Sequence, residues 1–156
     1  MNKVAIIQIR GGIGIRKTVK DTLKYLKLQR KNSCVIVEPT ESTKGMILKI
    51  KDYVTWGEID KETLKLLLQK RGRVAGGKPL TEEYLKDKTK GSFDDFVNKI
   101  SENKIKFKDV PGLKTYFRLH PPIRGFEKEG IKKPYSMGGT LGYRKDHIND
   151  LIKRMV

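Results

Sequence analysis

The hydrophobic positions in the first third of the chain alternate between short continuous runs and helical repeats. Runs rich in β-branched or aromatic residues cover 4–9, 33–37 and 54–59, which predicts three strands. Between the first two runs, Ile15, Val19 and Leu23 recur at helical spacing, and residues 46–53 repeat the pattern after the second run, which predicts two helices. The first 59 residues therefore predict a β-α-β-α-β core, with two helices packed on one face of a three-stranded sheet.

Turn and capping residues bound further elements along the chain. Residues 40–43 offer N-caps for the second helix, and Asp60 is expected to cap a third helix that ends in the turn 72–79. Two more helical segments are expected to start at Thr81 and Ser92. The second of these has a predicted capping box between Ser92 and Asp95.

The last third of the chain combines irregular and regular segments. Ile105 and Phe107 alternate with lysines and indicate an edge strand, whereas residues 121–142 hold three prolines and five glycines, which is typical of an extended loop. Asp146 is the expected N-cap of a last helix. The fold class is thus α+β: the core at 1–59, and at 60–156 a helical insertion, an extended basic Gly/Pro-rich segment and a C-terminal helix packed on the core.

The charge of the chain is strongly positive. Lys and Arg number 35 against 18 Asp and Glu, a formal net charge of +17, and a compact state with such a charge repels itself unless a polyanion neutralises it. Basic and acidic residues number 12 and 4 in residues 1–57, 11 and 9 in 58–105, and 12 and 5 in 106–156. Lysine-rich thermophile proteins usually raise glutamate in parallel, unlike this chain. The distribution predicts nucleic-acid-binding surfaces at both ends of the sequence.

Metal, disulfide and membrane chemistry are not expected. Cys34 is the single cysteine and lies in an apolar run, which is typical of a small buried hydrophobe. With only His120 and His147 beside it, the soft ligands are too few for a structural zinc site. No run of about 18 apolar residues or signal peptide is evident. We expect a cytoplasmic protein without a cofactor, metal or disulfide partner.

The glycine-rich turn RGGIGIRKT, residues 10–18, nearly spells a phosphate-binding P-loop. A P-loop has glycine directly before its Lys-Thr pair, so that backbone N–H groups wrap the phosphates, and Arg16 stands there instead. The dinucleotide-binding pattern fails too, because Lys17 takes the place of its third glycine. A small nucleotide-binding phosphotransferase stays an alternative. The simpler interpretation is a turn that approaches a phosphate backbone closely, with Arg16 and Lys17 adding positive potential.

Cations and aromatic residues interleave along the segment from Arg118 to Lys145. The diproline at 121–122 favours an extended backbone that holds Arg118 and His120 at set positions. Aromatic rings on such a segment suit unpaired RNA bases, and the alternative is that they anchor the segment to the domain. His120 lacks a neighbouring carboxylate or second histidine, so it is a weak candidate for acid–base catalysis.

Four segments, IIQIRGGIGIRKTVKDTLKYLKL, TKGMILKIKDYVTWGEID, FRLHPPIRGF and GGTLGYRKDHINDLIKRM, together resemble a known family. It is the large ribosomal subunit protein thirty family in its archaeal form, which is akin to eukaryotic large-subunit ribosomal protein seven. The resemblance covers essentially the whole chain, and KGM-x-x-KIKDYVTWGEI and FRLHPP are its specific parts. It implies a non-enzymatic structural constituent of the large ribosomal subunit, with a three-stranded antiparallel sheet, ferredoxin-like in part, seated on large-subunit rRNA near 5S rRNA and beside neighbouring ribosomal proteins.

Carried over to this sequence, the resemblance and the charge pattern together predict an RNA-facing set with no catalytic member. It comprises cations of the glycine turn, the first two helices and the C-terminal segment, together with one histidine: Arg10, Arg16, Lys17, Lys20, Lys24, Lys27, Lys44, Lys49, Lys51, Arg118, His120, Arg124, Lys132, Lys133, Arg144 and Lys145. A general nucleic-acid-compacting protein is the other alternative, since such proteins are also small and basic.

Overall fold

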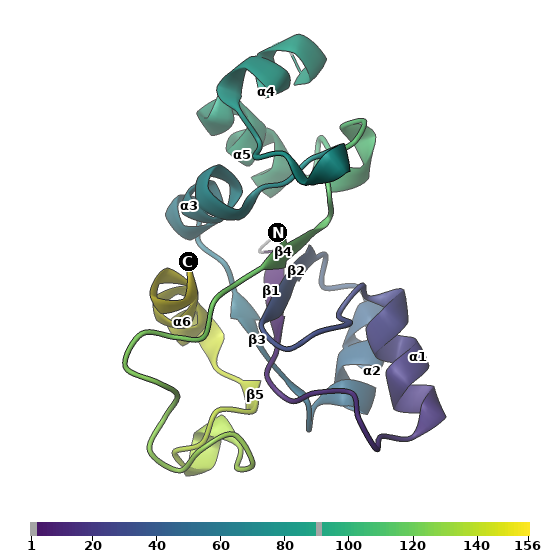
Figure 1. Ribbon diagram of the computed structural model, residues 1–156, viewed down its shortest axis with the longest axis vertical. Coiled ribbons are helices and arrows are strands. Elements are labelled where there is room, and N and C mark those ends of the chain that lie inside the picture. The colour runs from purple at the N-terminus through teal and green to yellow at the C-terminus, as the bar shows by residue number, and fades with distance from the viewer. Residues whose placement is uncertain (1–2, 90–91) are drawn as a thin grey trace.

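The computed structural model describes residues 3–89 and 92–156, and their strands form one sheet in the order β4-β2-β1-β3-β5 (Figure 1). β1 pairs antiparallel with both β2 and β3, β4 pairs antiparallel with β2, and β5 runs parallel to β3. The strands are β1 Val4–Gln8, β2 Ser33–Val37, β3 Val54–Glu58, β4 Tyr116–Arg118 and β5 Gly142–Tyr143. The expected three-stranded sheet is therefore the centre of a five-stranded one.

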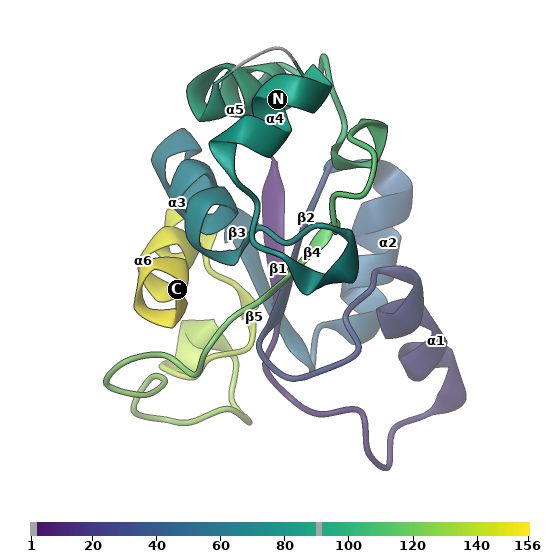
Figure 2. The same ribbon diagram turned by 45° about the horizontal axis from the view of Figure 1, so that its top comes forward.

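Helices cover both faces of this sheet (Figure 2): α1 and α2 pack together on one face, as expected for the first 59 residues, and helices from the rest of the chain cover the other face. Ile6 points to the face covered by α1 and α2, and its neighbour Ile7 points to the face covered by α3, α5 and α6. Because both faces of β1 are covered, all five of its residues are buried, and its sequence reads as a continuous apolar run. The helices are α1 Lys17–Tyr25, α2 Glu41–Ile50, α3 Lys61–Arg71, α4 Glu82–Thr89, α5 Phe93–Ser101 and α6 Ile148–Met155.

Two of the predicted helix starts are confirmed by their hydrogen bonds. The Thr40 hydroxyl accepts from the backbone N–H of Thr43 at 3.2 Å, which caps α2. At α5 the predicted capping box forms. The Ser92 hydroxyl accepts a hydrogen bond from the Asp94 N–H, and the Asp95 carboxylate accepts one from the Ser92 N–H at 3.1 Å. These caps are local sequence signals, so sequence alone located them.

Of two other predicted caps, Asp60 is right in position but makes no capping bond with its side chain, and Asp146 is wrong. Asp60 stands at the N-cap of α3 without a side-chain cap, and its own N–H donates to the Asn149 side-chain carbonyl at 3.0 Å. Asp146 lies inside a 3-10 turn, Lys145–His147, and α6 begins after it at Ile148. In both places contacts between β3 and α6, which are distant in sequence, decide how the helix starts.

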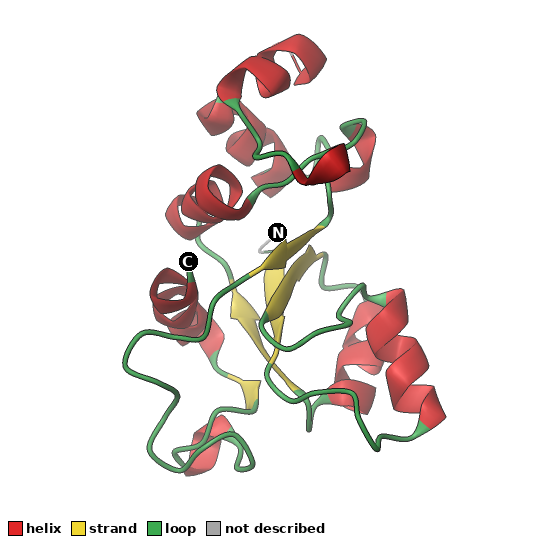
Figure 3. Ribbon diagram, viewed as in Figure 1, coloured by secondary structure: helices red, strands yellow, loops and turns green. Residues whose placement is uncertain are grey.

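The edge strand expected around Ile105 and Phe107 is also wrong. Phe107–Asp109 forms a 3-10 turn, and the Phe107 ring stands edge-on to the rings of Phe96 and Phe117 at centroid distances of 6.3 and 6.1 Å. β4 takes the edge position beside β2 instead. The loop that follows β4 runs from this edge of the sheet to the side where α6 lies, as Figure 3 shows.

Cys34 is fully buried in β2, and burial raises the pKa of its thiol to about 12. Because only the thiolate is a good nucleophile, we expect Cys34 to resist alkylation by iodoacetamide in the native protein and to react fully in denaturant. Mass spectrometry of the labelled chain measures this. Rapid native labelling would contradict the burial.

Candidate nucleic-acid interface

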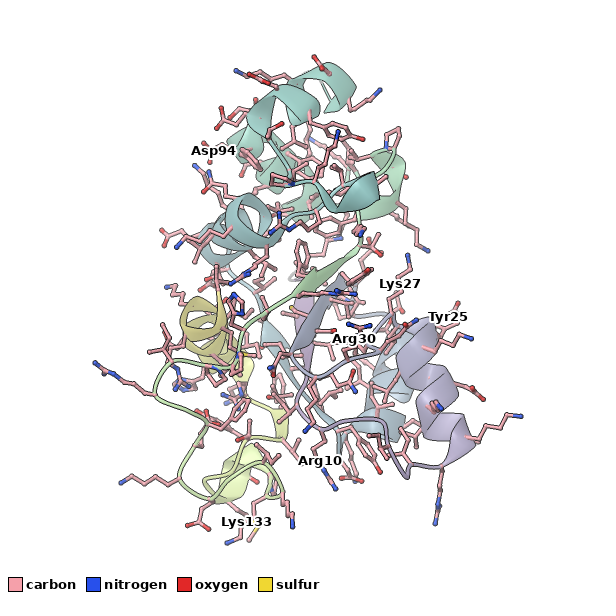
Figure 4. The ribbon with its side chains drawn as sticks, viewed as in Figure 1. Arg10, Tyr25, Lys27, Arg30, Asp94 and Lys133 are labelled. Atoms are coloured by element: carbon pink, nitrogen blue, oxygen red, sulfur yellow. The ribbon has the colours of Figure 1, made fainter. Side chains whose placement is uncertain are left out.

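The glycine turn is fixed to the sheet at its first residue. Arg10 follows β1, its guanidinium donates to the Asp52 carbonyl at 3.2 Å, and it lies 5.1 Å from the centroid of the Tyr53 ring (Figure 4). Beyond it, Ile13 is 98% exposed at the tip of the turn, and Gly14 has φ +72, a conformation that favours glycine. The turn thus projects from a rigid base.

Helix α1 presents the exposed cations Lys17, Lys20 and Lys24. Its first turn holds no acidic residue, and Arg16 stands at its N-cap, so the helix begins with positive charge where the helix dipole favours an anion. Lys27, predicted as a cation of this helix, lies outside it, because α1 ends at Tyr25 and Lys27 adopts φ +61. The Lys27 ammonium turns toward β4 and donates to the Thr115 hydroxyl at 2.9 Å.

Helix α2 packs beside α1 on the same face of the sheet, and its predicted cations Lys44 and Lys49 are exposed, as is Lys51 at its C-cap. Two large apolar side chains are exposed on the same pair of helices: Tyr25 at 77% and Leu48 at 63%. The outer surface of this layer therefore offers cations and apolar contacts together.

The C-terminal segment is tied to α6 at its beginning. The backbone N–H of His120 donates to the Met155 carbonyl at 2.9 Å, and that of Ile123 donates to the Arg154 carbonyl at 3.0 Å. The predicted residues exposed along it are Arg118, His120, Arg124, Lys132, Lys133 and Lys145. Lys133 forms an ion pair with Glu129, so its charge is partly neutralised within the segment (Figure 4).

Arg144 departs from the predicted set, because the structure buries it to 2% exposure. Its guanidinium forms an ion pair with Glu127 at 2.8 Å and donates to the Thr55 hydroxyl and the Thr140 carbonyl, each at 2.8 Å. It also lies 4.6 Å from the centroid of the Tyr135 ring. A side chain so enclosed is not available to a phosphate, and we correct its role to holding the C-terminal segment on β3.

Glu127 is held in its charged form by this contact. Burial alone would raise the pKa of Glu127, but hydrogen bonds from the Arg144 guanidinium and from the backbone of Glu127 itself, with the charge of Arg144, lower it below the usual value. The side chain of Glu127 is 20% exposed, and Arg154 approaches it at 3.6 Å from α6. The ion pair thus connects the segment, β3 and α6.

A cationic cleft lies along β4, and sequence reasoning missed most of it. We call it the β4 cleft: two adjoining hollows of about 260 and about 250 Å³ that share Tyr116 and Arg118. The first is also lined by Lys27 and Arg30, which Figure 4 labels between α1 and β4, and the second by Arg71, Arg73 and Lys114. Of these cations, only Lys27 and Arg118 belong to the predicted set.

The missed cations come from separate parts of the sequence. Arg71 and Arg73 lie in the middle third, whose charges nearly balance, and Lys114 lies in the loop between the 3-10 turn Phe107–Asp109 and β4. The structure brings them together because the Lys114 backbone N–H donates to the Arg73 carbonyl at 2.9 Å. Only the pairing of these distant segments reveals the cluster.

Within residues 3–89 and 92–156, no three His, Cys, Asp or Glu side chains gather where they could hold a metal ion. Nor does this part of the chain contain a helix of the length and apolarity that a membrane crossing requires. What the described surface does offer is a series of cationic areas at the glycine turn, α1, α2, the β4 cleft and the C-terminal segment.

Comparison with known proteins gives concordant results. Residues 4–54 match the model of a family described as ribosomal protein L30p/L7e. The chain is 48% identical over 149 residues to the large ribosomal subunit protein uL30 of Methanopyrus kandleri, which covers 95% of this chain and 100% of that protein. It is 50% identical over 152 residues to the proteins of the same name from Methanococcus vannielii and Nanoarchaeum equitans, covering 97% of this chain and 98% and 97% of theirs.

Proposed function

The chain belongs to the ribosomal protein L30p/L7e family, and on that basis we propose that it takes its place in the large ribosomal subunit by binding large-subunit rRNA near the 5S rRNA. As a member of this family it is a structural constituent of the cytoplasmic ribosome and not an enzyme. The phosphotransferase alternative is therefore excluded. Its partners are rRNA and neighbouring ribosomal proteins. We further propose that β1-α1-β2-α2-β3, which contains the matched residues 4–54, is the ferredoxin-like part of the fold.

The observation that carries the proposed binding is the net charge of +17 together with its placement. Exposed cations follow the glycine turn, α1, α2 and the C-terminal segment, and α1 begins with cations and no acidic residue. Such an arrangement is unfavourable in the free protein and becomes favourable on a polyanion. Phosphate contacts position a protein on RNA, while unpaired bases and RNA shape supply selectivity.

A binding titration tests the proposed function. The full chain is titrated with 5S rRNA, with large-subunit rRNA fragments and with an unrelated structured RNA of equal length, at two salt concentrations. We expect a ribosomal RNA to keep its advantage at the higher salt, because contacts to bases and shape are less screened than contacts to phosphates. Equal binding to all three RNAs, lost together as salt rises, would contradict the proposal. Equal affinity for duplex DNA would favour the compacting alternative.

The role of α1 is tested by the double substitution Arg16→Ala and Lys20→Ala. Each lost phosphate contact removes a little under one unit of the log–log salt slope, so we expect the slope of rRNA binding to fall by about 1 to 2 units. Lys86→Ala with Lys88→Ala, two exposed cations in the last turn of α4, is the matched control with the same change in charge. If both pairs change the slope equally, α1 makes no specific contact.

A further inference from the structure

The floor of the β4 cleft is an edge strand with an aromatic residue between two cationic hollows. β4 lies at the edge of the sheet, with Tyr116 opposite Val35 and Arg118 opposite Ser33. Because side chains alternate along a strand, Tyr116 and Arg118 share one face of β4, whereas Phe117 points to the other and is fully buried. Tyr116 is half-buried and lines both hollows. Tyr116 also packs against the apolar cluster on the α1–α2 face, so the residue that the two hollows share is partly held by the core.

The backbone on both sides of β4 is held by hydrogen bonds. On one side, the Ser33 N–H donates to the Arg30 carbonyl at 3.2 Å, and the Leu119 N–H donates to the Asn32 carbonyl at 2.9 Å. On the other, the contact between Lys114 and Arg73 joins β4 to the segment that follows α3. The cations are therefore presented from well-connected backbone, which preorganises the cleft.

Most charges in the β4 cleft have no counter-ion within the described part of the chain. Five of its six cations, Lys27, Arg30, Arg73, Lys114 and Arg118, form no ion pair there, and no acidic residue lines either hollow. Like charges gathered in a concave surface concentrate a positive potential. The fold maintains this cluster at an electrostatic cost that a bound anion relieves.

Arg71 adds a second, independent observation. Its terminal nitrogen Nη2 donates to the carbonyl of Val156 at 2.6 Å, but its Nε is buried and has no hydrogen-bond partner among the described residues. A buried donor without a partner is unfavourable, and side-chain oxygens of Gln8, Thr63 and Asn103 are in the same condition elsewhere in the described residues. Hydrogen bonds within the described residues therefore satisfy Arg71 only in part.

We propose that the β4 cleft binds an unpaired RNA segment, with one base stacked on Tyr116 and the phosphates on either side of it bound by Arg30 and Arg118 in one hollow and Arg73 and Lys114 in the other. This inference rests on the proposed rRNA binding and assigns a position to it. Stacking on an aromatic ring requires a base whose face is free, which a base inside a duplex lacks. The placement of a ring between two anion-binding hollows matches the alternation of base and phosphate along a single strand.

The test separates phosphate binding from base stacking. The triple substitution Arg30→Ala, Arg73→Ala and Arg118→Ala removes exposed cations whose side chains make no hydrogen bond within the described residues. Lys86→Ala, Lys88→Ala and Lys108→Ala is the control of equal charge. Binding is measured to the preferred rRNA fragment and to a single-stranded RNA oligonucleotide, free and annealed to its complement. We expect the triple substitution to lower the salt slope by about 2 units and the affinity for the free strand by about tenfold, with a smaller loss for the duplex.

Tyr116→Leu, compared with Tyr116→Phe, tests the stacking. Phenylalanine keeps the ring, so its affinity should match the wild type, whereas leucine should lose about tenfold in affinity with an unchanged salt slope. Circular dichroism checks that each variant is folded. Equal binding by the leucine and phenylalanine variants overturns the stacking, and a triple variant equal to its control overturns the cleft as an RNA site. Either result leaves the ribosomal preference of the wild type intact, so failure here is distinguishable from failure of the proposed function.

Discussion

Replacing Arg144 by methionine is expected to lower the free energy of unfolding by about 3 kcal/mol, because it leaves Glu127 without the partner that compensates its burial. The substitution also removes the donors to the Thr55 hydroxyl and the Thr140 carbonyl. For a chain of this size such a loss corresponds to a fall in Tm of about 6–12 °C. Thermal and urea unfolding of the variant and the wild type measure it.

The Arg144→Met substitution should first destabilise the segment that Arg144 holds on β3. The backbone N–H groups of Thr140 and Leu141 donate to the Lys133 carbonyl in the segment that Arg144 holds on β3, so their hydrogen exchange should accelerate more than that of β1. Lys145→Met is the matched control, since it removes the same charge from the neighbouring exposed position. Equal destabilisation by both substitutions would show that net charge, not the buried ion pair, is responsible.

The pH dependence identifies the ion pair. Because Arg144 helps hold the pKa of Glu127 below its unfolded value, the wild type gains stability from this group above the unfolded pKa of about 4.3 and loses it as the pH falls through the lower folded pKa. In the methionine variant Glu127 keeps only the more distant Arg154, 3.6 Å away. Protonation of Glu127 in acid then removes the cost of burying a carboxylate that has lost its main partner. The difference in stability between the two proteins should therefore narrow below about pH 4. A difference that stays constant down to pH 3 would argue against the ion pair as its source.

Replacing Gly57 by alanine is expected to cost about 3 kcal/mol, at the upper end of the range for overpacked sites. An added Cβ would lie 2.0 Å from the backbone carbonyl oxygen of Lys145 and 3.0 Å from Cβ of Ile148. Neither atom belongs to a flexible side-chain end, so the start of α6 must move away from β3. Urea unfolding measures the change in midpoint.

Gly45→Ala is the control for this substitution. Gly45 lies in α2 with no atom within 4 Å of an added Cβ, so alanine there should stabilise the protein by about 0.5–1 kcal/mol through helix propensity. Substitution by alanine is therefore expected to lower the free energy of unfolding at Gly57 and to raise it at Gly45. A stable Gly57→Ala variant would mean that the contact between β3 and α6 is looser than the structure has it.

Rigid contacts at β3 and Arg144 bear on the proposed RNA binding, because they position the C-terminal cations relative to the sheet. Arg118 leaves β4 at one edge, and Lys145 follows β5 at the other. Both strands are short, so their placement depends on the segments that they join.

The first 59 residues were predictable because their signals are local. The continuous apolar run of β1, the helical repeat through Leu23 and the cap at Thr40 each act over a few neighbouring positions, and the structure confirms the elements they predict. The glycine turn follows the same logic: it joins a buried strand to a helix and ends where α1 begins. Exposure of the cations on α1 and α2 also follows from the helical repeat, which reserves one side for the core.

Other features depended on contacts between distant residues. β4 and β5, with three and two residues, are too short for a periodic pattern and exist only by pairing with β2 and β3. The sequence does not distinguish Arg144 from the exposed cations of its segment. Only the tertiary structure shows that it is buried in an ion pair with Glu127.

The sequence by itself therefore determined the strongly basic character, the β-α-β-α-β core and the family. Tertiary structure alone decided which cations are exposed to a bound phosphate, because the burial of a charged side chain depends on the residues that pack around it. It buried Arg144, turned Lys27 toward β4, and brought Arg73 and Lys114 into one cleft.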